Sequence, residues 1–448
     1  MNQLYSLLFF VLLLHIPCCI HSSSTTYDLF QTWCVTHGKT YASEQEKLSR
    51  FKVFEENYAY ITQHNNDLAA NSSSSLYTLS LNAFADLTNQ EFKASRLGLS
   101  AGGNDKLIRM KRGSSIVKGS SGVRKAEIPS SLDWRDKGAV TNVKDQGSCG
   151  ACWSFSATGA MEGINQIVTG SLTSLSEQEL VDCDRSYNLG CDGGLMDYAY
   201  QFVIDNKGID TEDDYPYKSR ETTCDKDKLN RHVVTIDGYV DVRENDEAQL
   251  LEAVAAQPVS VGICGSERDF QLYSKGIFSG PCSTYLDHAV LIVGYGSEDG
   301  VDYWILKNSW GKQWGMDGYM YMQRNNGNSQ GICGINMMAS YPTKTSPNPP
   351  PSPSPVPTKC SLLYSCSEGE TCCCSWSLLG FCLTWKCCGL DSAVCCDDHK
   401  HCCPNDYPIC DTNRNLCLKQ TGNYTLVKEL GNKRSSGNWN SLLRDWNM

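Results

Sequence analysis

The order of apolar and polar residues predicts an unusual helix in the first part of the chain. Six residues recur at intervals of 4, 4, 3, 4 and 4, which at 100° per residue places them on one helix face: Glu46, Arg50, Phe54, Asn57, Ile61 and Asn65. A face that only packs a core would carry mainly apolar side chains. This stripe mixes a carboxylate, a guanidinium and two amides, so it favours a docking or network role.

Further along, the pattern changes from helices to strands. The run SFSATGAMEGINQIV (154–168) predicts a helix that starts at or just before Trp153, and the chain stays mostly helical to about residue 210. Runs of β-branched and aromatic residues punctuated by glycine then predict strands: VSVGI, HAVLIVGYG, DYWILKNSW and GYMYMQR. A helical half followed by a strand-rich half predicts an α+β domain with two lobes and a cleft between them.

The first residues have the pattern of a targeting segment. LLFFVLLL (7–14) is followed by the small and polar HSSS, which predicts a signal peptide over residues 1–24, although MNQLYS carries no Lys or Arg. The run is too short to span a bilayer, and no other stretch approaches about 20 apolar residues. We therefore expect the secretory pathway, with the vacuole, lysosome or extracellular space as destination. Asn71 and Asn423 are then candidate glycosylation sites.

Charge and cysteine content narrow the possible partners and the compartment. The chain has 39 Lys and Arg against 50 Asp and Glu, and its longest basic run is RMKR at 109–112, so a nucleic-acid or anionic-membrane partner is not expected. Twenty-five cysteines are far more than average, which is typical of an oxidising compartment where disulfides persist.

Composition also divides the chain into domains. Residues 341–359 hold eight of the fifteen prolines, and fourteen of the 25 cysteines fall after them, between Cys360 and Cys417. Such Pro/Ser sequence favours an extended spacer between two folded bodies. Residues 100–126 are rich in Gly, Ser and basic residues and predict an exposed, protease-accessible segment. The boundaries we predict after the signal peptide are 25–127, 128–343, a linker at 344–358, 359–418 and a tail at 419–448.

The stretch DQGSCGACWSF (145–155) raises the question of chemistry. Cys149 and Cys152 are either a redox or metal pair of the C-x-x-C kind, or a structural cysteine beside a nucleophile. The motif Cys-Gly-[Ser/Ala]-Cys-[Trp/Tyr] is the local signature of papain and cathepsin nucleophiles. Residues 128–343 resemble a papain-family cysteine peptidase, since LSEQELVDCD, GCDGG, LDHAVLIVGYG and WILKNSWGKQWGMDGY follow in the family's order. The redox pair therefore ranks far lower.

The resemblance implies a role for each catalytic residue. Cys152 is the nucleophile, at a helix N-terminus where the dipole and an imidazolium favour the thiolate. His288, 136 residues downstream, shares the proton and delivers it to the leaving amine. Asn308 orients the His288 ring, and Trp310 covers that hydrogen bond. Gln146 joins the Cys152 backbone N–H as the oxyanion hole.

The resemblance also implies which cysteines are paired. The expected disulfides are Cys149–Cys191, Cys183–Cys224 and Cys282–Cys333. Cys152 and Cys264 are left, and for Cys264 a buried inert thiol is favoured over a functional one.

Specificity in the family depends chiefly on the pocket for the side chain two positions before the cut. The residues expected to line it carry no charge: Leu195, Met196, Gly262, Leu286, Ala289 and Met338. Because an unpaired charge in an apolar pocket is strongly penalised, Leu, Val or Phe should be preferred there over Arg. Gly150 and Gly194 let the substrate backbone approach.

The regions on either side also resemble known modules. The stripe from Glu46 to Asn65 has the spacing of the ERFNIN pattern in papain-type propeptides. SLNAFADLTNQEF resembles the second propeptide motif through Asn82, Phe84 and Asp86, with Ser80 at the motif's glycine position. Residues 25–127 are therefore expected to cover the cleft as an inhibitor.

After the linker, CCDDHKHCCP (395–404) resembles the granulin signature, whose short β-hairpins are cross-linked by disulfides. Cys374 and Cys382 are additional to the common twelve-cysteine pattern, as in the granulin tails of plant papain-like enzymes. The alternative is a thiolate metal cluster with His399 and His401 as further ligands. Secretion and the even cysteine count favour disulfides and no metal.

Together these features predict a cysteine endopeptidase, made as a zymogen, that needs no cofactor. We expect a monomer that acts on peptides and proteins and is inhibited by its own propeptide and by cystatin-type proteins. Two alternatives are transpeptidation through the same thioester and a secreted signalling or interaction protein whose active part is the granulin.

Overall fold

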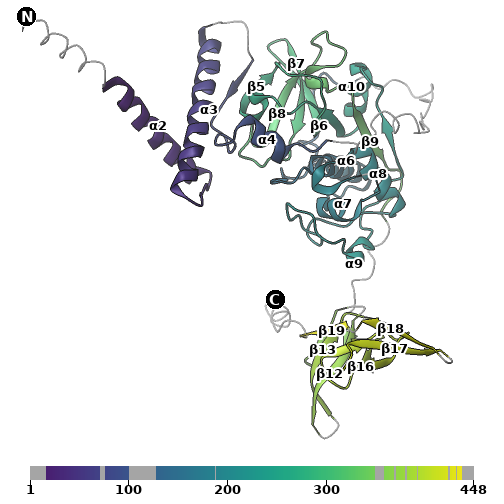
Figure 1. Cartoon of the computed structure of the whole chain (residues 1–448). Coiled ribbons are helices and arrows are strands. Elements are labelled where there is room, and N and C mark those ends of the chain that lie inside the picture. Colours follow the sequence, from purple (N-terminus) through teal and green to yellow (C-terminus); the bar gives the residue numbers. More distant parts are fainter. Residues whose placement is uncertain are drawn as a thin grey trace, which may run out of the picture. The chain divides into compact units, whose positions relative to one another are not determined.

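The computed structural model forms two compact units, Met1–Pro350 and Pro351–Met448, which we describe separately (Figure 1). It describes residues 17–70, 76–99, 128–186, 188–348, 358–367, 370–378, 381–390, 392–421, 424–429 and 431–435. Several predicted features lie outside these residues: the apolar run of the signal peptide, the segment 100–126, most of the Pro-rich linker, and Asn71 and Asn423.

The first two described helices are α2 (Pro17–Thr36) and α3 (Glu44–Ala70), and both are long. Phe30 and Trp33 of α2 pack against Phe54 of α3 at ring-centroid distances of 5.2 Å each, forming a small aromatic core. Strand β1 (Tyr77–Leu79) and helix α4 (Asn89–Arg96) follow, and a capping box of Thr88 and Glu91 starts α4.

The predicted stripe on α3 makes the network that its mixed chemistry suggested. Arg50 donates to Glu91 at 2.8 Å, and Asn57 donates to the carbonyl of Ala85 at 2.8 Å. Asn65 exchanges two hydrogen bonds with the backbone of Leu79. These polar residues therefore hold α3 to the following loop and strand while Phe54 and Ile61 are buried. Ser80 has no positive φ, so its position does not need glycine.

The next part of the chain is mostly helical, as predicted. Its elements are α6 (Cys152–Thr169), α7 (Glu177–Cys183), η1 (Gly190–Asp192), α8 (Met196–Asp205) and α9 (Lys226–Leu229). Helix α6 is buried from Cys152 to Asn165. The Ser156 hydroxyl donates to the Val290 carbonyl at 2.7 Å, and Ser260 donates back to the Ser156 carbonyl at 2.8 Å. These bonds tie α6 to the sheet.

The strand-rich part forms one sheet in the order β1-β5-β8-β7-β6-β4-β9-β3, with β2 beside β6. The strands after β1 are β2 (Leu132–Asp133), β3 (Gly238–Asp241), β4 (Val259–Ile263), β5 (Tyr273–Phe278), β6 (His288–Glu298), β7 (Val301–Lys307), β8 (Tyr319–Gln323) and β9 (Ala339–Thr343). Helices α10 (Glu247–Ala256), α11 (Arg268–Gln271) and η2 (Ile332–Gly334) connect them. The four predicted strands are present, and the fold is α+β.

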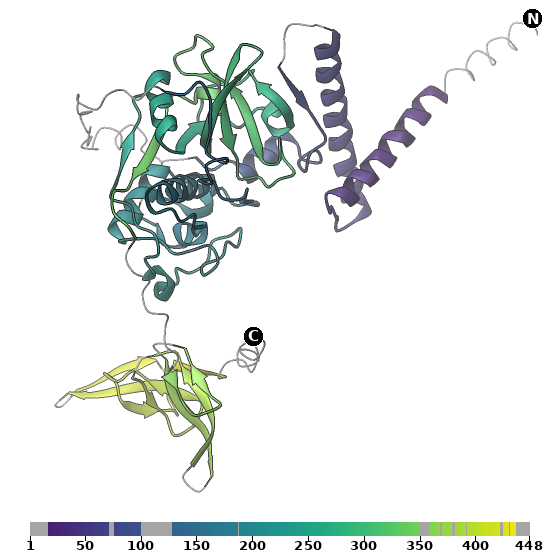
Figure 2. The same ribbon diagram turned by 180° about the vertical axis from the view of Figure 1, so that it is seen from behind.

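Strand β1 comes from the first part of the chain and extends this sheet. It pairs antiparallel with β5, where Tyr77 is opposite Gly276 and Thr78 opposite Lys275. Figures 1 and 2 show α3 and β1 at this edge of the sheet. This pairing is made by backbone hydrogen bonds. Residues 77–79, although they lie far from β5 in the sequence, are therefore part of the same sheet.

The second unit consists of short strands. They are β10 (Thr358–Lys359), β11 (Ser365–Cys366), β12 (Thr371–Leu378), β13 (Phe381–Cys388), β14 (Val394–Cys395), β15 (His401–Cys403), β16 (Ile409–Asp411), β17 (Leu416–Thr421), β18 (Tyr424–Glu429) and β19 (Gly431–Ser435). The last two lie in the region predicted as a tail. Strand β18 pairs with β17, and β19 pairs with β13 and β15, so this part of the tail belongs to the unit.

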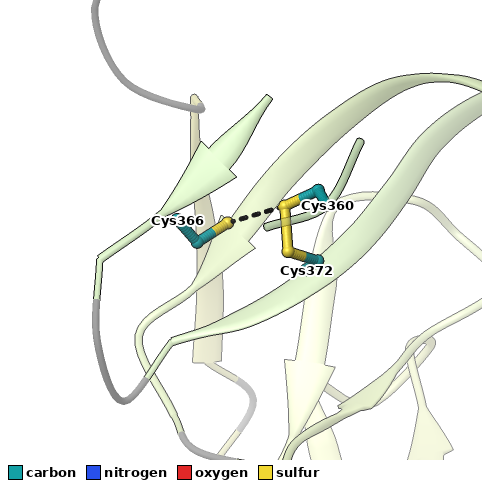
Figure 3. A group of neighbouring side chains, drawn as sticks. All are labelled: Cys360, Cys366 and Cys372. Atoms are coloured by element: carbon teal, nitrogen blue, oxygen red, sulfur yellow. Dashed lines mark hydrogen bonds between the residues drawn. A yellow bond between two sulfur atoms is a disulfide. The ribbon is translucent and has the colours of Figure 1, made fainter. Parts of the chain in front are cut away.

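All fourteen cysteines of this unit form disulfides. The pairs are Cys360–Cys372, Cys366–Cys387, Cys373–Cys395, Cys374–Cys382, Cys388–Cys402, Cys396–Cys410 and Cys403–Cys417. Figure 3 shows the Cys360–Cys372 bridge beside Cys366, whose sulfur lies 3.4 Å from that of Cys360. A disulfide sulfur carries no thiolate charge, so this pairing is the one expected of a cross-linked module rather than of a thiolate cluster.

Among the residues that the structure describes, no helix combines the length and the apolar character needed to cross a bilayer.

Candidate active site

Cys152 is the first residue of α6, with Ala151 as N-cap. Its position is held from both sides, since Cys149 is bonded to Cys191 and the Trp153 indole donates to the Gly190 carbonyl at 3.1 Å. The Cys152 side chain is fully buried in this form of the protein.

His288 approaches from the strand-rich part, as the first residue of β6. Its Nε2 lies 2.8 Å from Asn308 Oδ1, and since that oxygen only accepts, Nε2 carries the hydrogen. Trp310 stacks on the imidazole with ring centroids 4.4 Å apart and is 1% exposed. Asn308 and Trp310 thus orient and cover the ring, and among the described residues His288 Nδ1 has no hydrogen-bond partner.

Gln146 is buried next to this group. Its Oε1 accepts from the Ser309 hydroxyl at 2.6 Å, and its backbone N–H donates to the Ser309 carbonyl at 2.9 Å. The side chain is therefore fixed, with Nε2 donating to the carbonyl oxygens of Cys149 at 2.9 Å and Arg96 at 3.1 Å.

Comparison with known families accounts for most of the described chain. Residues 128–343 match the model described as papain family cysteine protease, residues 30–92 match the cathepsin propeptide inhibitor domain (I29), and residues 371–418 match granulin. A probable cysteine protease of Arabidopsis thaliana, RD21B, is 49% identical over 91% of this chain and 88% of its own length. The chain belongs to the papain family of cysteine proteases.

Other relatives and solved structures agree. The oryzain beta chain of Oryza sativa subsp. japonica is 47% identical over 90% of this chain and 87% of its own length. The proform of Amb a 11, a cysteine protease and ragweed pollen allergen, has a TM-score of 0.63 at 42% identity, covering 72% of this chain and 95% of that one. A recombinant stem bromelain precursor has the same TM-score at 38% identity, covering 72% of this chain and all of its own.

In this papain-family zymogen the end of the described propeptide lies over Cys152. The backbone N–H groups of Gly98 and Leu99 donate to the Asp287 carbonyl at 3.2 and 3.1 Å, and the Gly98 carbonyl accepts from Gly194 N–H at 3.0 Å. A side chain at residue 98 would lie 1.9 Å from the Gly150 carbonyl oxygen, so only glycine fits so close. Gly150 and Gly194 are the two positions predicted to admit a substrate backbone.

Leu99 lies beside residues of the predicted specificity pocket. Its side chain is 9% exposed and belongs to one apolar cluster with all of the predicted lining side chains: Leu195, Met196, Leu286, Ala289 and Met338. The sixth predicted residue, Gly262, faces it, since a Cβ there would meet Leu99 Cδ2 at 2.9 Å and Met338 Sδ at 3.2 Å. Leu99 could not be recognised from the sequence, because a single leucine in RLGL has no spacing that distinguishes it.

Burial under the propeptide changes the ionisation of the catalytic pair. Burial raises the pKa of the Cys152 thiol to about 12, although backbone N–H groups, including that of Gly98, act against the rise. Burial also lowers the pKa of His288 to about 4, against the effect of Asn308. Desolvation therefore disfavours the charged forms of both groups in this covered state, so the thiolate–imidazolium pair is expected of the uncovered site.

The other cysteines of the peptidase are as the resemblance implied. Disulfides join Cys149–Cys191, Cys183–Cys224 and Cys282–Cys333. From Cys34 to Cys333, the cysteines outside these disulfides are Cys34, Cys152 and Cys264, all buried. Cys264 lies 3.3 Å and 3.2 Å from the hydroxyls of Ser266 and Ser283.

Proposed function

We propose that the mature enzyme hydrolyses peptide bonds through a thioester on Cys152. The thiolate attacks the peptide carbonyl carbon, and His288 gives its proton to the leaving amine. Water then gives a proton to His288 and attacks the thioester carbonyl carbon, which releases the carboxylic acid product and returns the Cys152 thiolate and the protonated His288. The proposal is supported by the Cys152 position at the start of α6 and by the oriented, covered His288 ring.

The oxyanion that forms in the first step would be held by the Gln146 side chain and the Cys152 N–H. Support comes from Gln146 Nε2, which already donates to a propeptide carbonyl, that of Arg96, at 3.1 Å. One such donor typically lowers a barrier by about 3–4 kcal/mol. A Gln146→Ala variant is therefore expected to lower kcat by about a hundredfold or more with little change in KM.

The enzyme should prefer Leu, Val or Phe at the second position before the cut. The observation that carries this is the burial of Leu99 beside Gly262, in one apolar cluster with the other residues predicted for that pocket. Met338, whose sulfur lies 3.2 Å from the Cβ position of Gly262, has no charge to offer an arginine.

Two measurements test the proposal. An alkylating active-site probe should label Cys152 of the mature enzyme, and Cys152→Ala should abolish cleavage. A peptide library should rank Leu above Arg, and Met338→Glu should move the preference toward Arg, with Met337→Glu as the neighbouring control. A library in which Arg outranks Leu contradicts the pocket assignment, and full activity in Cys152→Ala contradicts the mechanism.

The same thioester could also be resolved by an amine, so products formed with added peptide amines will show how far ligation competes with hydrolysis. We further propose a secretory destination, the vacuole, lysosome or extracellular space, and inhibition of the monomeric enzyme by cystatin-type proteins.

A further inference from the structure

Asp269 is a buried carboxylate that the mechanism does not use. It lies in α11 and is 5% exposed. The Tyr60 hydroxyl donates to its Oδ1, the Tyr77 hydroxyl lies 2.5 Å from its Oδ2, and His64 Nδ1 lies 3.9 Å from Oδ2. Each side-chain partner that the described residues give to Asp269 therefore comes from the propeptide, two from α3 and one from β1.

The two phenols are suited to be lasting donors. Burial, the hydrogen bond with Asp269 and the charge of Asp269 together raise the pKa of Tyr60 to about 12. Burial and the same carboxylate raise the pKa of Tyr77 as well. Both hydroxyls therefore keep their protons across the physiological range. The Tyr77 hydroxyl also lies 2.8 Å from the Gly280 carbonyl, but the charged carboxylate is the stronger acceptor.

The neighbouring Arg268 holds Tyr60 in place. Its guanidinium lies 4.2 Å from the centre of the Tyr60 ring and donates to Asn57 Oδ1 at 2.7 and 3.0 Å. Tyr60 is therefore fixed through its ring by Arg268 and through its hydroxyl by Asp269. A propeptide without the phenol would leave the carboxylate buried and short of a donor, which is costly.

We propose that Asp269 is a specificity-determining residue for the propeptide: it makes the peptidase surface around α11 selective for a segment that presents hydroxyls at the positions of Tyr60 and Tyr77. This inference concerns how the propeptide is recognised and does not depend on the thioester mechanism. Once the propeptide leaves, the carboxylate stands on the surface that α3 and β1 had covered.

The test uses the full-length zymogen near neutral pH and measures how fast an alkylating probe labels Cys152, with peptide mapping to separate it from other thiols. Labelling requires the propeptide to open. Asp269→Ala should speed it about tenfold or more, since hydrogen bonds to a charged group are among the strongest. The double variant Y60F/Y77F should do the same. Tyr58→Phe, at a 36% exposed position on the same helix, is the matched control and should change nothing.

Combining Y60F/Y77F with Asp269→Ala distinguishes a specific contact from general loosening. The combined variant should be no more than about twofold faster than Asp269→Ala alone, because the donors and their acceptor act as one unit. Asp269→Asn, which keeps the shape and one acceptor oxygen, should lie between wild type and Asp269→Ala. If Asp269→Ala folds poorly, the labelling rate of Asp269→Asn still tests the proposal.

Two results overturn the proposal. In the first, Y60F/Y77F and Asp269→Ala are labelled at Cys152 at the wild-type rate. In the second, the rate increases of Y60F/Y77F and Asp269→Ala multiply in the combined variant. The kcat/KM of the mature Asp269→Asn enzyme should stay within about twofold of wild type. If the mature wild-type enzyme is not labelled at Cys152 at all, the proposed function fails instead.

Discussion

The peptidase and the granulin module are stabilised in different ways. The peptidase buries four tryptophans to 1% exposure or less, Trp153, Trp304, Trp310 and Trp314, and has three disulfides. In the granulin module the described buried side chains are cysteines, while Trp376 is 56% and Phe381 75% exposed. The first resists unfolding by burying apolar surface, and the second by covalent bonds.

This difference follows from size. A segment of about 60 residues exposes too much of its surface to build a sufficient core, so cross-links that restrict the unfolded chain must replace it. The two regions should therefore unfold under different conditions. The module should unfold when its disulfides are reduced, and the peptidase should lose stability when buried apolar side chains are truncated or buried carboxyls ionise.

The largest expected effect is that of a reducing agent. Each disulfide typically contributes about 2–4 kcal/mol, so loss of the seven in the module should unfold it completely. The peptidase of the Cys152→Ala zymogen should keep its fold at the same reductant concentration. Hydrogen exchange with peptide-level resolution measures both in one sample. Equal loss of protection in both regions would contradict the comparison.

Truncating one apolar side chain in each region should give the next largest difference. Ile292 is fully buried in β6 between Val259 and Leu306, so Ile292→Ala should destabilise the peptidase by about 2–5 kcal/mol. Leu383→Ala, at a 44% exposed position in β13, should change the stability of the module by less than about 0.5 kcal/mol. Denaturant titrations monitored in each region provide the measurement, and a costly Leu383→Ala would reveal an apolar core in the module.

A smaller effect is expected from removing a single cross-link. Cys374–Cys382 closes a loop of only 8 residues at the end of the β12–β13 hairpin. Replacing both with alanine should cost about 2 kcal/mol and leave the other bridges to hold the module. The measurement is the thermal unfolding temperature of the full-length double variant. Mass spectrometry of its peptides identifies which cysteines remain paired. Scrambled pairs would show that this bridge also directs the others.

The smallest expected effect is that of pH. Burial raises the pKa of Glu179 from 4.5 to about 8, so the stability tied to this carboxyl is full below about pH 4.5 and is lost as pH rises through about 8. The peptidase of the Cys152→Ala zymogen should lose stability between pH 5 and 8, and Glu179→Gln should make that slope shallower.

The granulin module serves as the internal reference for this pH series. Burial opposes ionisation of Asp398, but hydrogen bonding with His401 outweighs it and lowers the pKa of Asp398 to about 2. Since that carboxylate is already charged at pH 5, the module should show no comparable loss. A module that destabilises in parallel with the peptidase would point to a global cause instead.

A large part of this arrangement could be predicted from spacing. The stripe on α3 follows from its periodicity, because a repeat of 3.6 residues determines which side chains share a helix face. The helix at Cys152 and the four strands follow from the residue types in their runs. Motifs in order identified His288 and Asn308, which lie 20 positions apart and meet at 2.8 Å.

Contacts between distant segments could not be predicted in this way. Nothing in the residues around Asp269 indicates that Tyr60 and Tyr77 will meet it, since sequence separations of 209 and 192 leave the pairing to the packing of α3 and β1. The same holds for β18 and β19, since composition predicts a tail there but both strands pair with the granulin strands.

The sequence by itself determined the fold class, the three kinds of domain and the catalytic residue types, because these depend on local periodicity and on motifs with their own chemistry. Only the tertiary structure decided the state of the catalytic pair. A thiol at a helix N-terminus beside an imidazole favours ionisation as long as water reaches it. Once Gly98 and Leu99 cover the site, desolvation disfavours the charged forms of Cys152 and His288.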